Sequence, residues 1–554
     1  MTTADIGAGP RPIEAARGPV LRCKGWRQEA LLRMLENVLE VGERPEDLVV
    51  YAARAKAARN WPSFDAIVRA LMDLEENETL VVQSGKPIAV FPSHRMAPLV
   101  VMANSNIVGA WATRDNFDAY EAAGLTVWGG YTAGDWQYIG SQGIVQGTYQ
   151  AYAAVAREHF DGDLRGRLLV TAGMGGMGGA QPLAATMLGA ACLVVEVEPE
   201  RIQRRISTGY CQKMATSLDD ALAELEDARK RGEGLSIALV GNAADVLPEL
   251  VRRGITPDVA TDQTAAHDLL RGYVPPGLTT AERDALASSD QDKLRDLVLD
   301  AQARHMEALL AFHEKGAVVF EYGNLLRKHA TERGVPNAFD VPVWMDRYIR
   351  PLFCRGIGPF RWVAISGEES DINTLDDMLL DMFPDSPTIP QWIPLARQHI
   401  RTQGLPARIA WLGHGERALF AVAVNDAIAQ GKLIGPIAFT RDHLDSGSVA
   451  QPLRETANMQ DGSEAIADWP FLCALLDATG MADLVALHGG GAGYTGLRQS
   501  SGVTGIADGT REARERLDHV FTMDSGIGVL RYADAGYAEA IDAVGKTGLR
   551  RILV

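Results

Sequence analysis

The sequence predicts an α/β protein that contains a doubly wound parallel sheet, and three neighbouring segments carry this prediction. The segment "GRLLVTA", residues 166–172, is a short apolar run typical of a buried strand. The next residues, "GMGGMGGAQPLA" at 173–184, begin with glycines and continue with good helix formers. A second apolar run, "ACLVVEVE" at 191–198, completes a strand, turn, helix and strand.

The glycine-rich turn predicts a dinucleotide site. Gly173, Gly175 and Gly178 have the spacing G-x-G-x-x-G, which lets backbone N–H groups approach a pyrophosphate at a helix N-terminus. Glu196 follows at about the 20-residue separation of an acid that binds ribose hydroxyls. A carboxylate at this place, where NADP sites carry an arginine, favours NAD over NADP. The alternative is a tight turn without a ligand.

Composition restricts the classes of partner. The chain of 554 residues is too long for a single core and predicts about three domains. The formal net charge of −17, from 71 acidic and 54 basic residues, argues against nucleic acid as a partner. The five cysteines include no C-x-x-C pair, which predicts a reducing compartment with neither disulfides nor a zinc or other metal site. No run approaches the ~18 apolar residues of a membrane span, so we expect a cytoplasmic protein.

Four segments follow one another along the chain. Residues 1–23 lack an apolar segment, so we expect a flexible tail and no signal peptide. Residues 24–140 alternate helical patterns with short strands, and "VVQSGKPIAVF" at 81–91 predicts a hairpin. Residues 141–345 have the regular strand and helix alternation of a doubly wound, Rossmann-like domain. Residues 346–554 form a third region, rich at its start in arginine, aromatic residues and glycine.

Polar residues follow the later strands of the predicted parallel sheet. Ligands of open α/β sheets bind at the carboxyl ends of the strands, so these residues are expected to line one crevice beside the glycine turn. Taken singly, each is equally well explained as a cap or turn residue. They are Asn242, then Asp262, Gln263, Thr264 and His267, then Glu321, Tyr322, Gly323 and Asn324.

The residues themselves suggest two kinds of chemistry. A cofactor domain predicts a dehydrogenase, in which His267 is either the acid–base residue or a structural hydrogen-bonding group. In the third region Arg355, Arg361 and Arg454 are candidates to bind a substrate carboxylate, or else form surface ion pairs. The run "RDHLDSG" places Asp442 and His443 side by side, which suits proton transfer but lacks the spacing of metal motifs.

Five long strings together give a specific resemblance. The segments "GGMGGAQPLA", "DQTAAHD", "FCRGIGPFRWVAISG", "QGLPARIAWLGHG" and "RDHLDSGSVA", in this order, resemble urocanase from about residue 24 onward. The resemblance implies a urocanase fold, in which the NAD domain is inserted into an α/β core made of the N- and C-terminal segments, and a homodimer. It also implies a hydratase that adds water to an imidazole propenoate and yields an imidazolone or hydantoin-type propionate. NAD+ is then tightly bound and not consumed, because its nicotinamide serves as an electrophile.

The resemblance also implies roles for matched positions. Substrate contacts are implied for Tyr51, Thr132, Arg355 and Arg454, with Asp442 and His443 near the reacting ring. The implied NAD contacts are Gly176, Met177, Gly178, Glu196, Arg201, Asn242, Ala243, Gln263, Thr264, His267, Tyr273 and Tyr322.

The sequence departs from the family pattern at the motifs expected around the ligands. Ala410 stands where urocanases carry a cysteine, and the sequence has Ala52 and Ala53 where they have two glycines. Asp135 replaces a smaller polar residue, and Gln137 an apolar one. In addition, Gly130 stands in place of a glutamine, and "LHGGG" at 487–491 has one histidine where the family has two.

These changes suggest a paralogue with a different substrate. Loss of the cysteine at position 410 predicts room for a sulfur substituent on ring C2, as in thiourocanate or its S-methyl derivative. The S-methyl form agrees better with the loss of polar groups, because a thioether needs no hydrogen-bond donor. The alternatives are a divergent urocanate hydratase, an NAD-dependent dehydrogenase, and an NAD-binding protein without catalytic activity.

Overall fold

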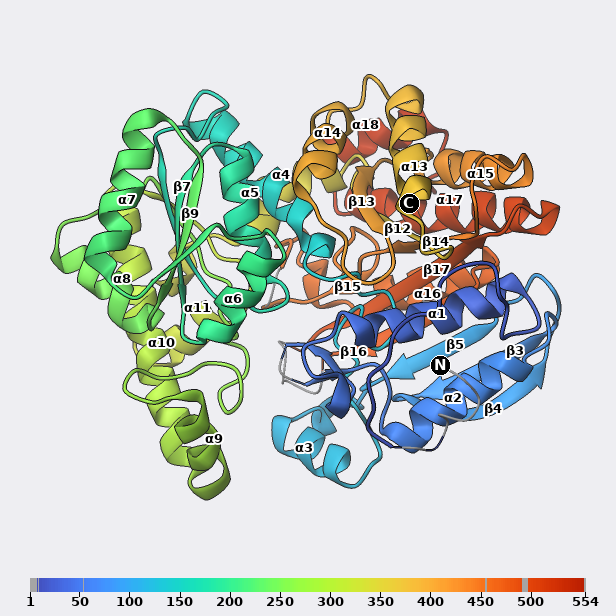
Figure 1. The fold of residues 1–554 in the computed structure, drawn as a ribbon, viewed down its shortest axis with the longest axis horizontal. Helices are drawn as coiled ribbons and strands as arrows, with labels where there is room; N and C mark the ends of the chain where they lie inside the picture. The colour runs from blue at the N-terminus through green and yellow to red at the C-terminus, as the bar shows by residue number, and fades with distance from the viewer. Residues whose placement is uncertain (1–6, 8, 53, 454–455, 491–496, 553–554) are drawn as a thin grey trace.

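The computed structural model describes residues 7, 9–52, 54–453, 456–490 and 497–552. Figure 1 shows two parts side by side, one built from the middle of the chain and one in which the first and last segments lie together. The fold is therefore α/β, with the middle of the chain inserted into a core made by its two ends, as the sequence and the resemblance predict.

The inserted part contains a six-stranded sheet in which all neighbouring strands are parallel. Its strand order is β11-β10-β6-β7-β9-β8. After β6 the chain builds one half of the sheet and then crosses to the other side of β6, which places the topological switch point beside this strand. The strands are β6 (Leu168–Ala172), β7 (Ala191–Glu196), β8 (Lys213–Ala215), β9 (Leu235–Val240), β10 (Val259–Ala260) and β11 (Val318–Val319).

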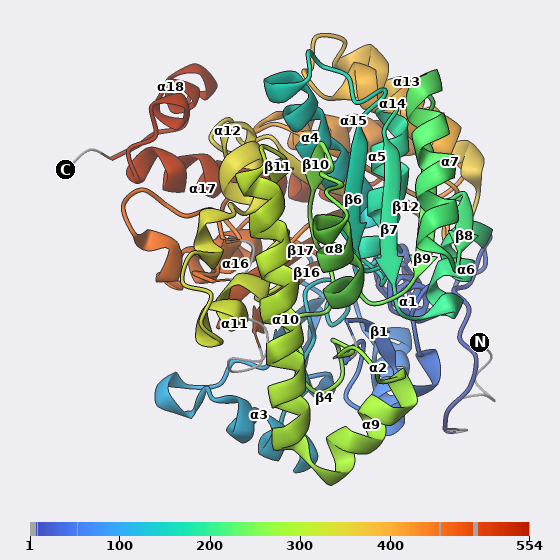
Figure 2. The same ribbon diagram turned by 90° about the vertical axis from the view of Figure 1, so that its left-hand side faces the viewer.

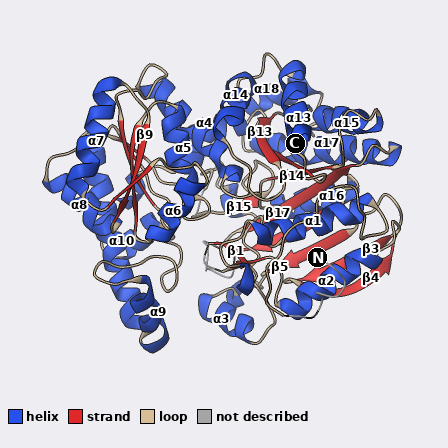
Figure 3. Cartoon of the chain, in the orientation of Figure 1, coloured by secondary structure: helices blue, strands red, loops and turns tan. Residues whose placement is uncertain are grey.

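Helices cover both faces of this sheet, with α7 and α8 on one side and α5 and α6 on the other (Figure 3). In the side view of Figure 2 the long α10 runs lengthwise along the domain, from the region of β11 down to α9. The helices are α5 (Gln181–Met187), α6 (Pro199–Ser207), α7 (Leu218–Arg231), α8 (Ala243–Arg252), α9 (Thr280–Ser289), α10 (Gln291–Glu314) and α11 (Leu326–Glu332). The predicted doubly wound arrangement is thus present, while the bounds 141–345 stay a prediction.

The second part is built on a mixed sheet of nine strands. Its order is β13-β12-β14-β17-β16-β5-β3-β4, with β15 paired to β17. The first and last segments join where β5 and β16 pair in parallel. The strands are β3 (Glu78–Gln83), β4 (Lys86–Pro92), β5 (Val100–Asn104), β12 (Gly358–Ala364), β13 (Ala407–Leu412), β14 (Ile437–Arg441), β15 (Val449–Ala450), β16 (Leu484–Gly489) and β17 (Gln499–Ala507), and a separate pair is formed by β1 (Val49–Tyr51) and β2 (Ala55–Lys56).

The predicted hairpin is confirmed as β3 and β4, which pair antiparallel. Its two turn residues, Ser84 and Gly85, have φ values of 44° and 67°. Positive φ at both central residues is the geometry that matches the twist of a two-residue hairpin.

In the portion of the chain that the structure describes, eleven α-helices belong to the core part, and α4 connects it to the inserted domain. They are α1 (Trp26–Glu40), α2 (Trp61–Asp73), α3 (Arg114–Ala122), α4 (Gln142–His159), α12 (Arg350–Phe353), α13 (Glu369–Met382), α14 (Ile389–His399), α15 (Glu416–Ala429), α16 (Asp468–Thr479), α17 (Arg511–Asp534) and α18 (Ala538–Thr547). Because α4 contacts both α5 and β13, one apolar core runs through both parts. Among the described residues, no helix combines the length and apolar character needed to cross a bilayer.

The prediction of a flexible tail over residues 1–23 is wrong for the second half of this segment. Ile13 and Ala15 are buried, and the Ala15 N–H donates to Glu40 at 2.8 Å. Arg22 forms ion pairs with two carboxylates of α1, Glu29 and Glu36. This segment contains neither helix nor strand, and these contacts hold it against α1. Sequence patterns of period 2 or 3.6 detect strands and helices, so they do not reveal contacts of this kind.

Candidate functional site

The glycine turn lies at the carboxyl end of β6, at the switch point of the sheet. Gly173 has a φ of 89°, and a Cβ atom there would lie 2.5 Å from the carbonyl oxygen of Gln263. A Cβ on Gly178 would clash with the carbonyl of Gly173. Glycine has no Cβ atom, so the turn can lie this close to the loop that follows β10. Neither Gly173 nor Gly178 has a side chain of its own to cover its backbone.

A cavity of about 980 Å³ opens over this turn. Its wall comes from the segments that follow β6, β7, β9, β10 and β11, together with Glu43, Tyr51 and Ala52 from the N-terminal segment. All twelve residues for which the resemblance implies NAD contacts line it: Gly176, Met177, Gly178, Glu196, Arg201, Asn242, Ala243, Gln263, Thr264, His267, Tyr273 and Tyr322.

Glu196 is fixed at the end of β7 with its carboxylate facing the turn. One oxygen accepts the Met174 N–H at 2.7 Å, and the other accepts the Glu198 N–H at 3.1 Å. Burial raises the pKa of Glu196, while the nearby Arg201 opposes the shift. Each oxygen keeps a further lone pair for a ligand hydroxyl.

Two amide side chains of this cavity have different partners. Asn242 caps α8 by accepting the Ala244 N–H at 3.0 Å and donates to Val274 at 2.8 Å, so it is a structural cap as well as a lining residue. By contrast, the buried Oε1 of Gln263 accepts no hydrogen bond from the described residues. A buried carbonyl oxygen without a donor is unfavourable, and a bound ligand would satisfy it.

A second cavity, of about 380 Å³, adjoins the first, and Tyr51, Gly176 and Met177 line both. The Tyr51 Oη accepts the backbone N–H groups of Tyr131 and Thr132, each at 2.9 Å. Burial raises the pKa of Tyr51, which keeps its hydroxyl protonated. The remaining lining residues are Tyr131, Thr132, Tyr138, Gly140, Gly143, Ile144, Arg361, Asp442 and Leu444.

Arg361, rather than Arg355, supplies the guanidinium of the second cavity. Arg355 is exposed, immediately after α12, and is not among the residues that line the described cavities. The buried Arg361 on β12 forms an ion pair with Asp442 and donates to the Gly143 carbonyl at 3.0 Å. Its Nε and Nη1 atoms have no partner among the described residues. Arg454, the other predicted arginine, lies outside the described residues.

His443 does not line the second cavity but packs against Tyr131, which does, so its place near the reacting ring stays a prediction. Its Nε2 is 2.5 Å from an oxygen of Asp135, and its Nδ1 is 3.0 Å from the Ser500 hydroxyl. Tyr131 packs edge-on against it, with ring centroids 5.9 Å apart. Burial lowers the pKa of His443 well below its usual value and raises that of Asp135 to about 7.

Ala410 does not face the second cavity. It lies on β13 opposite Phe360 of β12, and Phe360 packs on Phe521 of α17 with ring centroids 4.8 Å apart. Side chains alternate along a strand, so Arg361, the next residue on β12, points to the other face of the sheet. The prediction that Ala410 makes room beside the substrate is therefore wrong, because strand alternation directs its methyl group toward α17.

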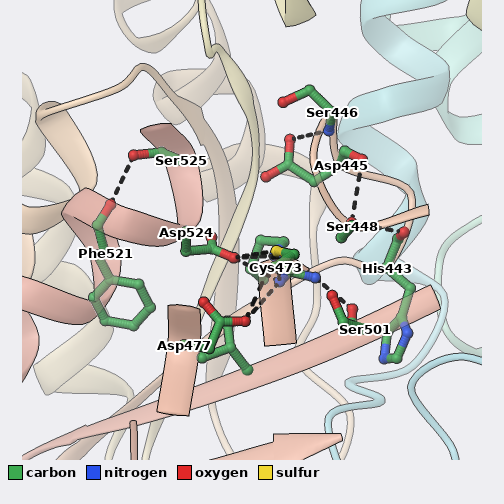
Figure 4. Close-up of polar contacts among 12 residues, drawn as sticks. His443, Asp445, Ser446, Ser448, Cys473, Asp477, Ser501, Phe521, Asp524 and Ser525 are labelled. Atoms are coloured by element: carbon green, nitrogen blue, oxygen red, sulfur yellow. Dashed lines mark hydrogen bonds and ion pairs between the residues drawn. The ribbon is translucent and has the colours of Figure 1, made fainter. Parts of the chain in front are cut away.

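A second buried polar cluster surrounds Cys473 of α16 (Figure 4). Cys473, Asp477 and Asp524 bring three possible metal ligands together, and Asp135, His443 and His488 form another such group. In the first group the Arg441 guanidinium contacts Asp524 at 2.5 Å and Asp477 at 3.3 Å. This fixed cation supplies the positive charge that the carboxylates require, so the cluster is described best as a structural ion-pair network.

Comparison with known proteins agrees with this architecture. Models of the urocanase N-terminal domain, Rossmann-like domain and C-terminal domain match residues 13–137, 140–348 and 351–546. S-methyl thiourocanate hydratase of Variovorax sp. (strain JCM 16519 / RA8) is 54% identical over 540 residues, which are 98% of this chain and 97% of that protein. The chain therefore belongs to the urocanase family.

Proposed function

We propose that this protein is a hydratase that adds water to S-methyl thiourocanate while NAD+ stays bound. The observation that supports the proposal is that Tyr51, Gly176 and Met177 line both the cavity over the glycine turn and a smaller cavity that holds a guanidinium. The substrate follows from the relative named S-methyl thiourocanate hydratase, at 54% identity across nearly the full length of both chains.

The residues of the first cavity fit NAD+. The cavity holds a glycine turn that a Cβ would block, a carboxylate at the ribose position in Glu196, and the unpartnered Oε1 of Gln263. The twelve lining residues named above would hold the cofactor. When bound, NAD+ supplies an electrophilic ring that withdraws electron density from an electron-rich heteroaromatic substrate.

The second cavity would bind the imidazole propenoate. Arg361 offers two free N–H donors, Nε and Nη1, to the substrate carboxylate, and Asp442 orients the guanidinium from its other side. The Tyr51 oxygen accepts two backbone N–H groups and lies 3.5 Å from the Thr132 hydroxyl, and its own hydrogen can be donated at the junction of the cavities. Tyr51 would therefore hold a proton at Oη, next to the reacting ring.

One set of measurements tests this function against its alternatives. The purified protein should release a stoichiometric amount of NAD on denaturation and should consume S-methyl thiourocanate without added NAD. A higher kcat/KM for urocanate would return the protein to urocanate hydration, and NADH formation with substrate would identify a dehydrogenase. Bound NAD without turnover of any imidazole propenoate would indicate a protein without catalytic activity. The cytoplasmic location and the homodimer stay predictions.

A further inference from the structure

A third cavity, of about 280 Å³, continues the proposed substrate site on its apolar side. It shares Gly143, Ile144, Asp442 and Leu444 with the second cavity. The residues that belong to this cavity and not to the second are Gly147, Trp344, Met345, Phe353, Pro359 and Trp411.

The wall of this cavity is aromatic and buried. Phe353 and Trp411 stack with ring centroids 5.8 Å apart, and Trp344 and Met345 are equally buried. Asp442, the acidic residue of the wall, is paired with Arg361. Such a space binds a small, polarizable, uncharged group better than it binds an ion, because a charge would lose its hydration there.

Two glycines of α4, one helical turn apart, keep the cavity open. A Cβ on Gly147 would lie 3.2 Å from Cη2 of Trp344 and 3.4 Å from Cζ2 of Trp411. A Cβ on Gly143 would lie 3.1 Å from Cζ of Arg361. Any side chain at these positions would narrow the space between the aromatic residues and the guanidinium.

We propose that this cavity receives the methylthio group of the substrate and that its aromatic wall determines the preference for an S-methylated ring. This inference rests on the proposed function. The third cavity joins the proposed substrate site at Gly143, Ile144, Asp442 and Leu444, and its aromatic wall is the part of the site that can bury an apolar substituent of the ring. A thioether sulfur and its methyl group make favourable contacts with aromatic rings. Urocanate, with hydrogen at C2, would leave the extension unfilled and lose these contacts.

The test compares Gly147→Ala and Trp411→Phe with the wild type on S-methyl thiourocanate and on urocanate. Gly147→Ala narrows the cavity, and Trp411→Phe removes part of its wall. Each variant should lower the ratio of kcat/KM for S-methyl thiourocanate to kcat/KM for urocanate by about 10-fold or more, the usual effect of a methyl-sized mismatch in an apolar pocket. Val145→Ile is the matched control, because it adds one carbon to α4 at a buried position outside this cavity.

A binding measurement separates this inference from catalysis. The saturated analogue, 2-methylthioimidazole propionate, has no side-chain double bond to hydrate, and its Kd by calorimetry should rise in both variants but not in Val145→Ile. If the wild type consumes S-methyl thiourocanate but both variants lose activity on the two substrates equally, with unchanged analogue binding, the methylthio site is wrong and the proposed function stands. If the wild type does not consume S-methyl thiourocanate, the proposed function fails, and this inference fails with it.

Discussion

Replacing Glu196 by alanine should yield protein largely free of NAD. The substitution removes the carboxylate proposed to bind the ribose hydroxyls, and it leaves the Met174 N–H of the glycine turn without its acceptor at 2.7 Å. A hydrogen bond to a charged group contributes about 1.5–3 kcal/mol. Two such bonds to the ribose diol amount to about 3–6 kcal/mol, which corresponds to roughly 10²- to 10⁴-fold weaker binding.

The assay is the amount of nucleotide released per chain after denaturation, measured by chromatography. Glu198→Gln is the matched control, because Glu198 lies two residues further on, pairs with Arg201 at 3.1 Å and does not line the first cavity. Circular dichroism checks the fold, and Glu196→Gln, which keeps one acceptor oxygen, serves if the alanine variant is unstable. Full retention of NAD by a folded Glu196→Ala protein would refute the placement of the ribose on this carboxylate.

Three further predictions concern Arg361, Asp135 and Ala410. Arg361→Lys should raise the KM about 10- to 100-fold through loss of a charged hydrogen bond, whereas Arg355→Lys should leave steady-state kinetics unchanged; equal effects would contradict the assignment. Burial raises the pKa of Asp135 to about 7, so the folded protein keeps a proton that the unfolded chain releases at lower pH. Asp135 therefore contributes a component of the free energy of unfolding that falls as the pH rises from about 4 to 7, by up to about 1.4 kcal/mol per pH unit, against the opposite component of His443, whose pKa is lowered by burial. Urea titrations of Asp135→Asn should lack the component that falls, and a pH profile identical to that of the wild type would disprove it. Finally, Ala410→Cys should lower stability by about 1–3 kcal/mol through overpacking, yet leave the substrate ratio unchanged, and a shift toward urocanate would show that position 410 does act on the substrate.

Local spacing was sufficient to predict many of the residues that line the first cavity. Gly173, Gly178 and Glu196 belong to one strand, turn, helix and strand unit, in which sequence separation fixes geometry. The strand ends at Asn242 and Gln263 were predictable for a related reason, because parallel strands of one sheet present their carboxyl ends at the same edge. A repeated local pattern therefore determines much of this cavity.

The second cavity depends on how distant segments pack, and the sequence by itself left its lining open. Arg355 and Arg361 have similar surroundings in the sequence, but Arg355 lies after α12 in solvent while Arg361 points from β12 into a cavity closed by α4. The direction of Ala410 follows from the pairing of β13 with β12, which no local pattern states. The apolar cavity lies where α4, α12, β12 and β13 meet, and a Cβ atom on Gly147 would lie 3.2 Å from Trp344 and 3.4 Å from Trp411. Side-chain direction and empty volume are properties of the packed structure, so tertiary contacts alone decided them.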